Sequence, residues 1–560
     1  MNILFILIFS KVILVGTAAS EVIMVSPDGT MDFMKIQDAI NSSRDGDEIV
    51  VFKGIYCENL MVSKSIVLKG EKKPIIDGKL FYNESSPSRA PLISITANNV
   101  TIDGFTIVNC DEDTCGSGAI KISSSGCKFL NNVICNCSGH GIYISDGSNH
   151  LISKNVIKNC EKAGMKIFRT DNNKIAGNNL SHHKTFGISI EESQFNELMK
   201  NEIYENKRGG IGLRESDLNN LIMNDIYQIE EDGVYFRRSS NNVLKDNVIY
   251  GCFYSGIVLR DLSSNNVIEM NSIWNCGECG ILMVESSDNV SIVQNNLSKN
   301  SDCGIGIYGC ERSTISENQI SNNHKNGILL RYNGRDNEIT DNIICRNAVC
   351  GVHIDQCASN FVLRNNIYDN LNGVIVSDSN DNEVISNDIH DNDQGIILGS
   401  TKHTLVGTNL VRNNTNNGVQ IINCDENNVS KNDIYDNGID GLRLYSSENL
   451  TLYENKIWNN DEYGIQLLGS SNQNLLMDNV VRNCGQGGIY IYEGHSNSIV
   501  DNRLIDNKNF NGWNDRSNKW LHNFYSDYAG QDIDGDGLGD LPYSIQGRRG
   551  TFIVDPSPRM

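Results

Sequence analysis

The sequence predicts an all-β fold, a single-stranded right-handed parallel β-helix of about 20 coils. Two regularities lead to this prediction. Seventeen glycines recur at intervals of 22 to 24 residues from Gly118 to Gly488, which is the mark of a repeat architecture. An asparagine follows each of these repeat glycines after 14 or 15 residues, as Asn132 follows Gly118. Every repeat therefore shares one internal layout.

Each repeat is expected to supply three short strands. In residues 141–163, three short apolar segments are separated by Ser, Asn, Gly and Asp rather than by helix formers. A leucine-rich repeat has a similar length and an asparagine ladder, but its helical half does not suit these turn-rich segments. Coils stacked at roughly 4.8 Å would give a solenoid about 95 Å long.

The chain divides into four predicted parts. Residues 1–20 are an apolar run that closes on small residues, which predicts a secretory signal, with an uncleaved anchor as the alternative. Residues 21–117 are expected to form an N-terminal cap and the first coils. Residues 118–507 are the regular repeats, and residues 508–560 are an aromatic C-terminal cap. No second membrane segment is evident.

A helix is expected to plug the N-terminal end of the solenoid. Residues 31–43 carry apolar residues at helical spacing behind Asp32, which is a candidate helix cap. Such a helix would cover the otherwise open strand edges.

Composition restricts the partners. The formal charge is −22 and the pI is about 4.9. There is thus no surplus of Lys and Arg to neutralise phosphates, which argues against nucleic acid. We expect a monomer, and a polyanionic ligand would need a local basic patch.

The 17 cysteines follow the repeat. Cys137 and Cys160, for example, both lie four residues before a repeat glycine, a regularity that favours buried stacking thiols. Cysteines one coil apart, such as Cys279 and Cys303, are also close enough for a disulfide, so both states stay open.

Ten Asn-x-Ser/Thr sequons occur in this asparagine-rich chain. Several fall at repeat positions where the amide is expected to be buried in a turn, including Asn136, Asn179, Asn296 and Asn428. Asn41 and Asn83 lie outside the ladder and are the better glycan candidates.

Three segments near the N-terminus, VSPDG, IQDAI and GDEIVVFKGIYCEN, resemble the entry segment of pectinesterase-like β-helix proteins. The tail NFYSDYAGQDIDGDGLGDLPYSI is similar to the closing motif of archaeal surface members of the NosD-type family of carbohydrate-binding and sugar-hydrolase (CASH) repeats. The resemblance covers nearly all of the mature chain. It implies a pectin-lyase-like solenoid that is secreted or located at the cell surface and binds a polysaccharide.

The tail contains a candidate calcium loop. Asp532, Asp534, Asp536 and Asp540 offer hard oxygen ligands on a glycine-broken loop. Tyr543 stands where an EF-hand has its bidentate Glu, so we expect a shorter, weaker structural calcium site. The alternative is an acidic solvated turn.

Binding residues are expected on the outer face of the strand that each repeat glycine begins. If the first and third residues after the glycine point inward, the second and fourth point outward and form lanes across successive coils. With the adjoining fifth position, the lanes between Gly164 and Gly351 are rich in binding chemistry. The candidate ligand-binding residues are Lys166, Phe168, Glu191, Arg214, Tyr235, Arg237, Arg260 and Arg331.

Arg214, Arg237 and Arg260 occupy the same repeat position and should form a row. Guanidinium forks suit carboxylates and sulfates, and aromatic rings suit sugar faces. The row therefore predicts binding of an extended acidic polysaccharide. A ladder of solvated ion pairs, or a protein-binding face, would explain the same residues.

Catalysis has weaker support. Glu192 and Glu215 lie one coil apart, near the carboxylate separation of retaining glycosidases, but coil spacing alone produces that distance. His353 and Asp355 are a second candidate pair. The Tyr-Gly-Phe-Asp-Pro-His signature of the related mannuronan epimerases is absent. Binding is favoured over turnover, and an enzyme would be a polysaccharide lyase, epimerase or glycoside hydrolase.

Two other functions stay open. The resemblance to NosD implies a periplasmic accessory role in copper-site maturation, which requires a soft or imidazole-rich cluster. The 10 histidines and 12 methionines are scattered instead. The other alternative is a structural rod of the cell envelope, or an interaction scaffold, without a small ligand.

Overall fold

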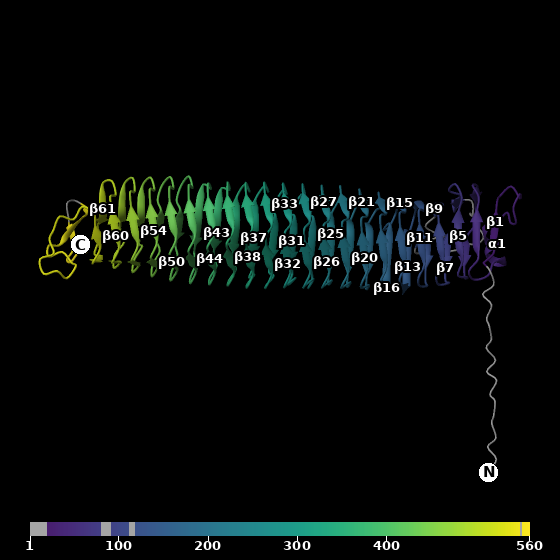
Figure 1. Cartoon of the computed structure of the whole chain (residues 1–560), viewed down its shortest axis with the longest axis horizontal. Coiled ribbons are helices and arrows are strands. Elements are labelled where there is room, and N and C mark those ends of the chain that lie inside the picture. Colours follow the sequence, from purple (N-terminus) through teal and green to yellow (C-terminus); the bar gives the residue numbers. More distant parts are fainter. Residues whose placement is uncertain (1–19, 80–90, 111–117, 549–551) are drawn as a thin grey trace, which may run out of the picture.

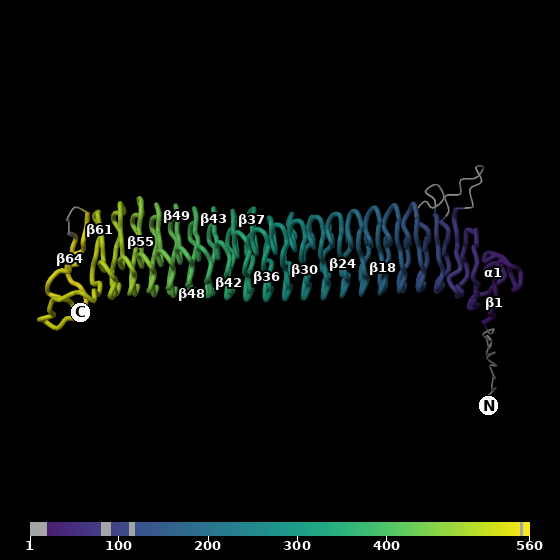
Figure 2. Tube along the Cα trace, turned by 90° about the horizontal axis from the view of Figure 1, so that it is seen from above, coloured from purple at the N-terminus to yellow at the C-terminus, as the bar shows by residue number. Residues whose placement is uncertain are grey.

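The protein is a long, straight solenoid, seen here in a computed structural model that describes residues 20–79, 91–110, 118–548 and 552–560. Figure 1 shows helix α1 (Ile36–Ser42) at the N-terminal end and irregular loops at the C-terminal end. The successive coils are stacked side by side along one axis in Figure 2. The predicted signal, residues 1–20, and the Asn83 sequon fall outside the described residues, except for Ser20.

Three parallel sheets run the length of the rod, with about 21 turns in all. In one coil β16 (Met165–Asp171) lies in sheet C, β17 (Lys174–Ala176) in sheet A and β18 (Asn179–Ser181) in sheet B. Each pairs in parallel with its equivalent one coil on, as Lys166 pairs with Ser189. The parallel pairing begins at β1 (Val22–Val25) and continues beyond residue 507, through β63 (Phe524–Tyr525) to β64 (Tyr543–Gln546). The predicted fold class is confirmed.

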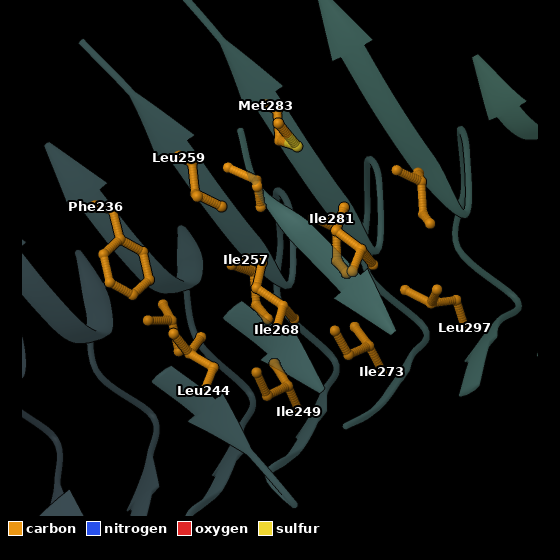
Figure 3. Packing of buried hydrophobic residues seen from close by; sticks show 14 of the residues in the cluster. Phe236, Leu244, Ile249, Ile257, Leu259, Ile268, Ile273, Ile281, Met283 and Leu297 are labelled. Atoms are coloured by element: carbon orange, nitrogen blue, oxygen red, sulfur yellow. The ribbon is translucent and has the colours of Figure 1, made fainter. Parts of the chain in front are cut away.

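Apolar side chains, mostly aliphatic, from all three sheets fill the interior. Phe236 from sheet C, Leu244 from sheet A and Ile249 from sheet B meet inside one coil (Figure 3). From Gly141 onward the first and third residues after a repeat glycine are buried, as Met165 and Ile167 are. Gly118 pairs with His140 rather than with Gly141, so it stands one residue before the position that the other repeat glycines occupy. In the coils from Gly141 onward, the second and fourth residues face outward, so the predicted orientation of the lanes is correct there.

An unbroken asparagine ladder joins the coils from Asn132 to Asn523. The backbone N–H and side-chain Nδ2 of Asn201 both donate to Oδ1 of Asn224, at 3.1 and 2.9 Å. The same Nδ2 also donates to the carbonyl of Ile175, at 2.9 Å. These side chains satisfy buried turn groups that the strand ladders cannot reach.

The N-terminal helix is present but its predicted cap is wrong. Helix α1 (Ile36–Ser42) buries Ile36, Ala39 and Ile40 against the first coil, as a plug should. Asp32 instead accepts a hydrogen bond from the N–H of Met24, at 2.8 Å. The helix N-terminus is capped by Glu58, whose two carboxylate oxygens each accept a backbone N–H, from Ile36 and Gln37, at 2.9 Å. Glu58 follows the helix in the chain and is 22 residues from Ile36, so helical spacing does not predict this cap.

Aromatic side chains close the C-terminal end. Trp520 and Tyr525 are each only 2% exposed and fill the last coil. Beyond them, β64 (Tyr543–Gln546) pairs antiparallel with β65 (Phe552–Asp555), the reverse of the strand direction elsewhere in the described solenoid. Reversal of the strand blocks further parallel stacking at this end.

Most of the described cysteines are buried free thiols, including Cys137, Cys160, Cys279 and Cys303, and Cys110 is disulfide-bonded. Cys279 and Cys303 pack together with Leu329 on the outside of sheet C. Within the described residues no helix has the length and apolarity that a membrane span needs.

His183 stands in a second buried column, between Cys160 and Asn206, and replacing it with Asn is expected to stabilise the protein. Its Nδ1 accepts the N–H of Cys160 at 3.2 Å, while its buried Nε2 has no hydrogen-bond partner among the described residues. Burial lowers the pKa of His183 from 6.5 to about 3. Below pH 6.5 the unfolded chain therefore binds a proton that the folded chain does not, and stability falls as the pH falls toward 3.

The gain of His183→Asn should thus be small at pH 7, about 1 kcal/mol, and should grow as the pH falls from 6.5 toward 3. Thermal unfolding of both proteins across this pH range measures it. His182→Asn is the matched control, because His182 is exposed and pairs with Glu205. Equal pH profiles for wild type and His183→Asn would contradict the prediction.

Candidate functional site

A hollow of about 590 Å³ lies on the outer face of sheet C. It spans six successive strands of this sheet, so residues far apart in the sequence meet in it. The strands are β13 (His140–Ser148), β16, β19 (Phe186–Glu191), β22 (Gly209–Arg214), β25 (Asp232–Arg237) and β28 (Ile257–Arg260).

Small residues form the floor of the hollow. Ser189 and Gly212 pair across β19 and β22 at the second position after the repeat glycine. Larger side chains stand at this position on either side, Lys166 in β16 and Tyr235 in β25. A Cβ at Gly212 would lie only 2.8 Å from the ring of Phe186, so a larger residue would displace that ring and fill the floor.

The fourth position after each glycine forms a wall rich in arginine. Glu191, Arg214, Arg237 and Arg260 follow one another in register. Glu191 pairs with Lys166 and also with Arg214, whose Nη1 lies 3.0 Å from its Oε1.

The arginines are held by carboxylates but keep free donors. Nε of Arg237 lies 2.5 Å from Oδ2 of Asp261, and Nη2 of Arg260 lies 3.1 Å from Oε1 of Glu285. Asp261 is the hydrogen-bond partner of Arg237 among the described residues, so both its Nη groups stay available. The side chains of Arg214, Arg237 and Arg260 are 52, 42 and 41% exposed. An anion in the hollow can therefore reach all three.

The opposite wall comes from residues that precede the repeat glycines. The Phe186 ring lies beside the Arg208 guanidinium, 5.7 Å from centroid to Cζ. Asp232 accepts a hydrogen bond from the N–H of Ser255 at 3.0 Å, and burial raises its pKa to about 6. Tyr254, which is 41% exposed, completes this wall.

The hollow brings six of the eight predicted ligand-binding residues together. They are Lys166, Glu191, Arg214, Tyr235, Arg237 and Arg260. Phe168 lies beside it, with its ring 4.7 Å from the Arg169 guanidinium. Arg331 is remote, on β37 (Asn326–Arg331), and its Nε bonds Asp355 at 2.7 Å.

The four weak catalytic candidates do not line the hollow. Glu192 and Glu215 lie in equivalent turns of successive coils, each with positive φ just after its sheet C strand, and pair with Arg169 and Arg238, at 2.8 and 3.0 Å. Because the two glutamates occupy equivalent positions in successive coils, the repeat alone accounts for their one-coil spacing.

His353 and Asp355 lie on β40 (Cys350–Asp355), four strands of sheet C beyond β28, and share Ser377. Ser377 Oγ is 3.1 Å from Nε2 of His353 and 3.2 Å from Oδ1 of Asp355. Burial lowers the pKa of His353. This cluster is a separate hydrogen-bonded group.

Sequence reasoning missed one wall of the hollow. In three coils the residue directly before the repeat glycine lines the hollow, but the predicted lanes started two residues after the glycine. The three lining residues at this position are His140, Phe186 and Asp232. Including the residue that precedes each repeat glycine among the candidate positions would have identified them from the sequence.

The aspartate loop brings three of its four predicted ligands together. Carboxylate oxygens of Asp532, Asp534 and Asp536 lie within 4.8 Å of one another. Asp540 instead accepts the N–H of Ile533, at 2.6 Å. Asp532 also accepts backbone N–H bonds from Gly535 and Gly537, at 2.7 and 2.9 Å. The set is hard and anionic, as a calcium site requires.

A family model described as "right handed beta helix region" matches overlapping segments that together cover residues 45–524. The chain belongs to the right-handed β-helix family. Among solved structures, the chain is similar to a periplasmic alginate epimerase, AlgG, with 15% identity and a TM-score of 0.44 over 52% of this chain and 83% of that one. A PL6 family alginate lyase, AlyGC, has 12% identity and a TM-score of 0.43 over 90% of this β-helix protein and 93% of the lyase. At these identities the likeness concerns the fold alone.

A curated relative is a cell surface glycoprotein from Methanothermus fervidus. It is 38% identical over 107 residues, which make up 19% of this chain and 16% of the relative. The β-helix protein thus matches only a short part of that relative's length.

Proposed function

We propose that this β-helix protein is a cell-surface protein that binds an extended acidic polysaccharide along the outer face of sheet C. The observation that carries the proposal is the hollow itself, in which Ser189 and Gly212 leave room beneath a row of exposed arginines. The surface location is supported by the short match to the Methanothermus fervidus cell surface glycoprotein.

Charge and shape both suit a chain of uronate or sulfated sugars. Arg214, Arg237 and Arg260 repeat once per coil and present guanidinium donors on a protein of charge −22. Tyr235 stands at the end of the floor, one strand beyond Gly212, where its ring can contact a sugar face. Repetition along the axis suits a polymer better than a single small anion.

Replacing Arg214, Arg237 and Arg260 together by Gln should weaken polygalacturonate binding at least 10-fold, because each contact is a charge-assisted hydrogen bond. Binding measured by calorimetry at two salt concentrations should also weaken with added salt in the wild type. Dextran, an uncharged polymer, should bind no better than background.

The matched control changes the same number of charges elsewhere. Arg312, Arg346 and Arg364 are exposed, ion-paired arginines in turns beside sheets A and B. Their triple replacement by Gln should leave binding intact. Equal losses of binding in both variants, or no binding of any acidic polymer by the folded wild type, would contradict the proposal. The arginines would then be explained as part of a ladder of solvated ion pairs.

We also propose that calcium occupies the aspartate loop. Replacing Asp534 and Asp536 by Asn should weaken calcium binding in a titration, because it removes two carboxylates from the three-carboxylate group. Calcium should slow hydrogen exchange near this loop in the wild type and not in the variant. Unchanged exchange on chelation would make the loop an acidic turn.

The arrangement of metal ligands favours this proposal over a copper accessory role. In the part of the chain that the structure describes, the one group of three or more His, Cys, Asp or Glu side chains with ligand atoms within 4.8 Å of one another is the aspartate group. Copper would prefer sulfur and imidazole.

A further inference from the structure

The sequons lie in exposed positions, contrary to the expectation for those at repeat positions. None of the nine described sequon asparagines is buried; eight are exposed and Asn179 is half-buried. The expectation was wrong because the buried ladder uses the neighbouring residue. Asn427, for example, is buried in its column, whereas Asn428 points to solvent.

The described sequons avoid sheet C. Asn41 is on helix α1, and the other eight belong to sheets A and B or to their flanking turns. On the sheet A side Asn99, Asn289 and Asn449 lie in the turns just before β8 (Thr101–Asp103), β32 (Ser291–Val293) and β53 (Thr451–Tyr453), and Asn428 begins β50 (Asn428–Ser430).

The sheet B side carries the other four sequons. Asn136 lies within β12 (Val133–Cys137), Asn179 begins β18, Asn296 begins β33 (Asn296–Ser298) and Asn413 follows β48 (Leu410–Arg412). Sheet C and the walls of its hollow contain none of the nine.

We propose that the protein is N-glycosylated at these sequons, so that glycans coat sheets A and B and leave the outer face of sheet C bare. In each transfer the Asn Nδ2 forms a bond to the anomeric carbon of a lipid-phosphate-activated oligosaccharide. The bond from that carbon to the phosphate oxygen breaks, and the phosphate leaves with the proton that Nδ2 loses. No electron transfer is involved.

The fold tolerates the modification because each linked amide keeps one N–H. Nδ2 of Asn449 donates to Oδ1 of Asp425 at 2.9 Å, and Nδ2 of Asn289 donates to Oδ1 of Asn265 at 2.6 Å. One hydrogen suffices for each bond. A buried ladder amide such as Asn224 has no such freedom, since its Nδ2 donates to both Leu198 and Asn247.

Mass spectrometry of peptides from the protein recovered from its own cell envelope tests the proposal. Peptides that contain Asn136, Asn296 or Asn428 should carry sugar masses, whereas peptides from sheet C should not. Ser430→Ala should abolish the sugar at Asn428 with the asparagine left in place, and Ser430→Thr should retain it.

Three results would overturn the inference. Unmodified masses for all the described sequon peptides would exclude glycosylation at these sites. Equal modification of Ser430→Ala and Ser430→Thr would show that the group on that peptide is not attached through the sequon. Sugars on asparagines of sheet C would contradict a bare face. This test does not depend on whether polygalacturonate binds.

Discussion

Replacing Asp555 by alanine is expected to loosen the last coils of the solenoid. Asp555 is fully buried and ends the asparagine ladder. Its Oδ2 accepts the backbone N–H and the Nδ2 of Asn523, at 2.9 and 3.0 Å, and the hydroxyl of Tyr525 at 3.2 Å. Its Oδ1 accepts the N–H of His522 at 3.1 Å. Alanine leaves these buried donors without a partner, at a cost of about 3 kcal/mol.

The effect should stay local, because each coil of a solenoid contacts only its neighbours. Hydrogen exchange should accelerate in the coils nearest residue 555 and not near residue 200. Asp555→Asn should be milder, since one carbonyl oxygen remains to accept. Asp506→Ala is the matched control, because Asp506 is exposed. Slow exchange at the C-terminal end of Asp555→Ala would contradict a capping role.

A break in the middle of the ladder should be comparably severe. Asn224 accepts two hydrogen bonds from Asn201 and donates to Oδ1 of Asn247 at 3.0 Å and to the carbonyl of Leu198 at 2.9 Å. Asn224→Ala removes all four and leaves the buried groups of Asn201 and Leu198 unsatisfied. We expect a loss of about 3 kcal/mol, the sum of one to two buried polar penalties.

Chemical denaturation and hydrogen exchange of the Asn201 amide measure this loss. Asn220→Ala is the control, since Asn220 is four residues away but exposed on β23 (Asn220–Ile222). If both variants were equally stable, the ladder hydrogen bonds would add no net stability over the hydrogen bonds that the same groups make with water in the unfolded chain.

Much of the fold could be predicted because repetition makes local pattern and global structure the same. The repeat glycines indicated the coil length, and alternation after Gly164 predicted that Met165 is buried and Lys166 faces out. The arginine row followed from the same count. In a parallel solenoid a fixed sequence interval becomes a fixed spatial step.

The site could be predicted only in part, because side-chain volume and pairing decide it. The count placed Arg331 in the same lane as Arg260, but the hollow ends near Arg260. The shape of the floor at Gly212 depends on Phe186 of the preceding coil, because the Phe186 ring lies where a side chain at position 212 would begin. Neither fact follows from spacing.

The sequence by itself determined the coil, the three strands in each coil, the inward and outward faces and the columns of asparagine, because these depend on periodicity. Tertiary structure alone decided that Glu58 rather than Asp32 caps helix α1 and that Asp555 ends the asparagine ladder. These two carboxylates come from chain segments that do not repeat, so no period predicts their partners. At each end of the rod there are backbone N–H groups without a partner in a neighbouring coil. Buried N–H groups need a hydrogen-bond acceptor, and these two carboxylates supply it.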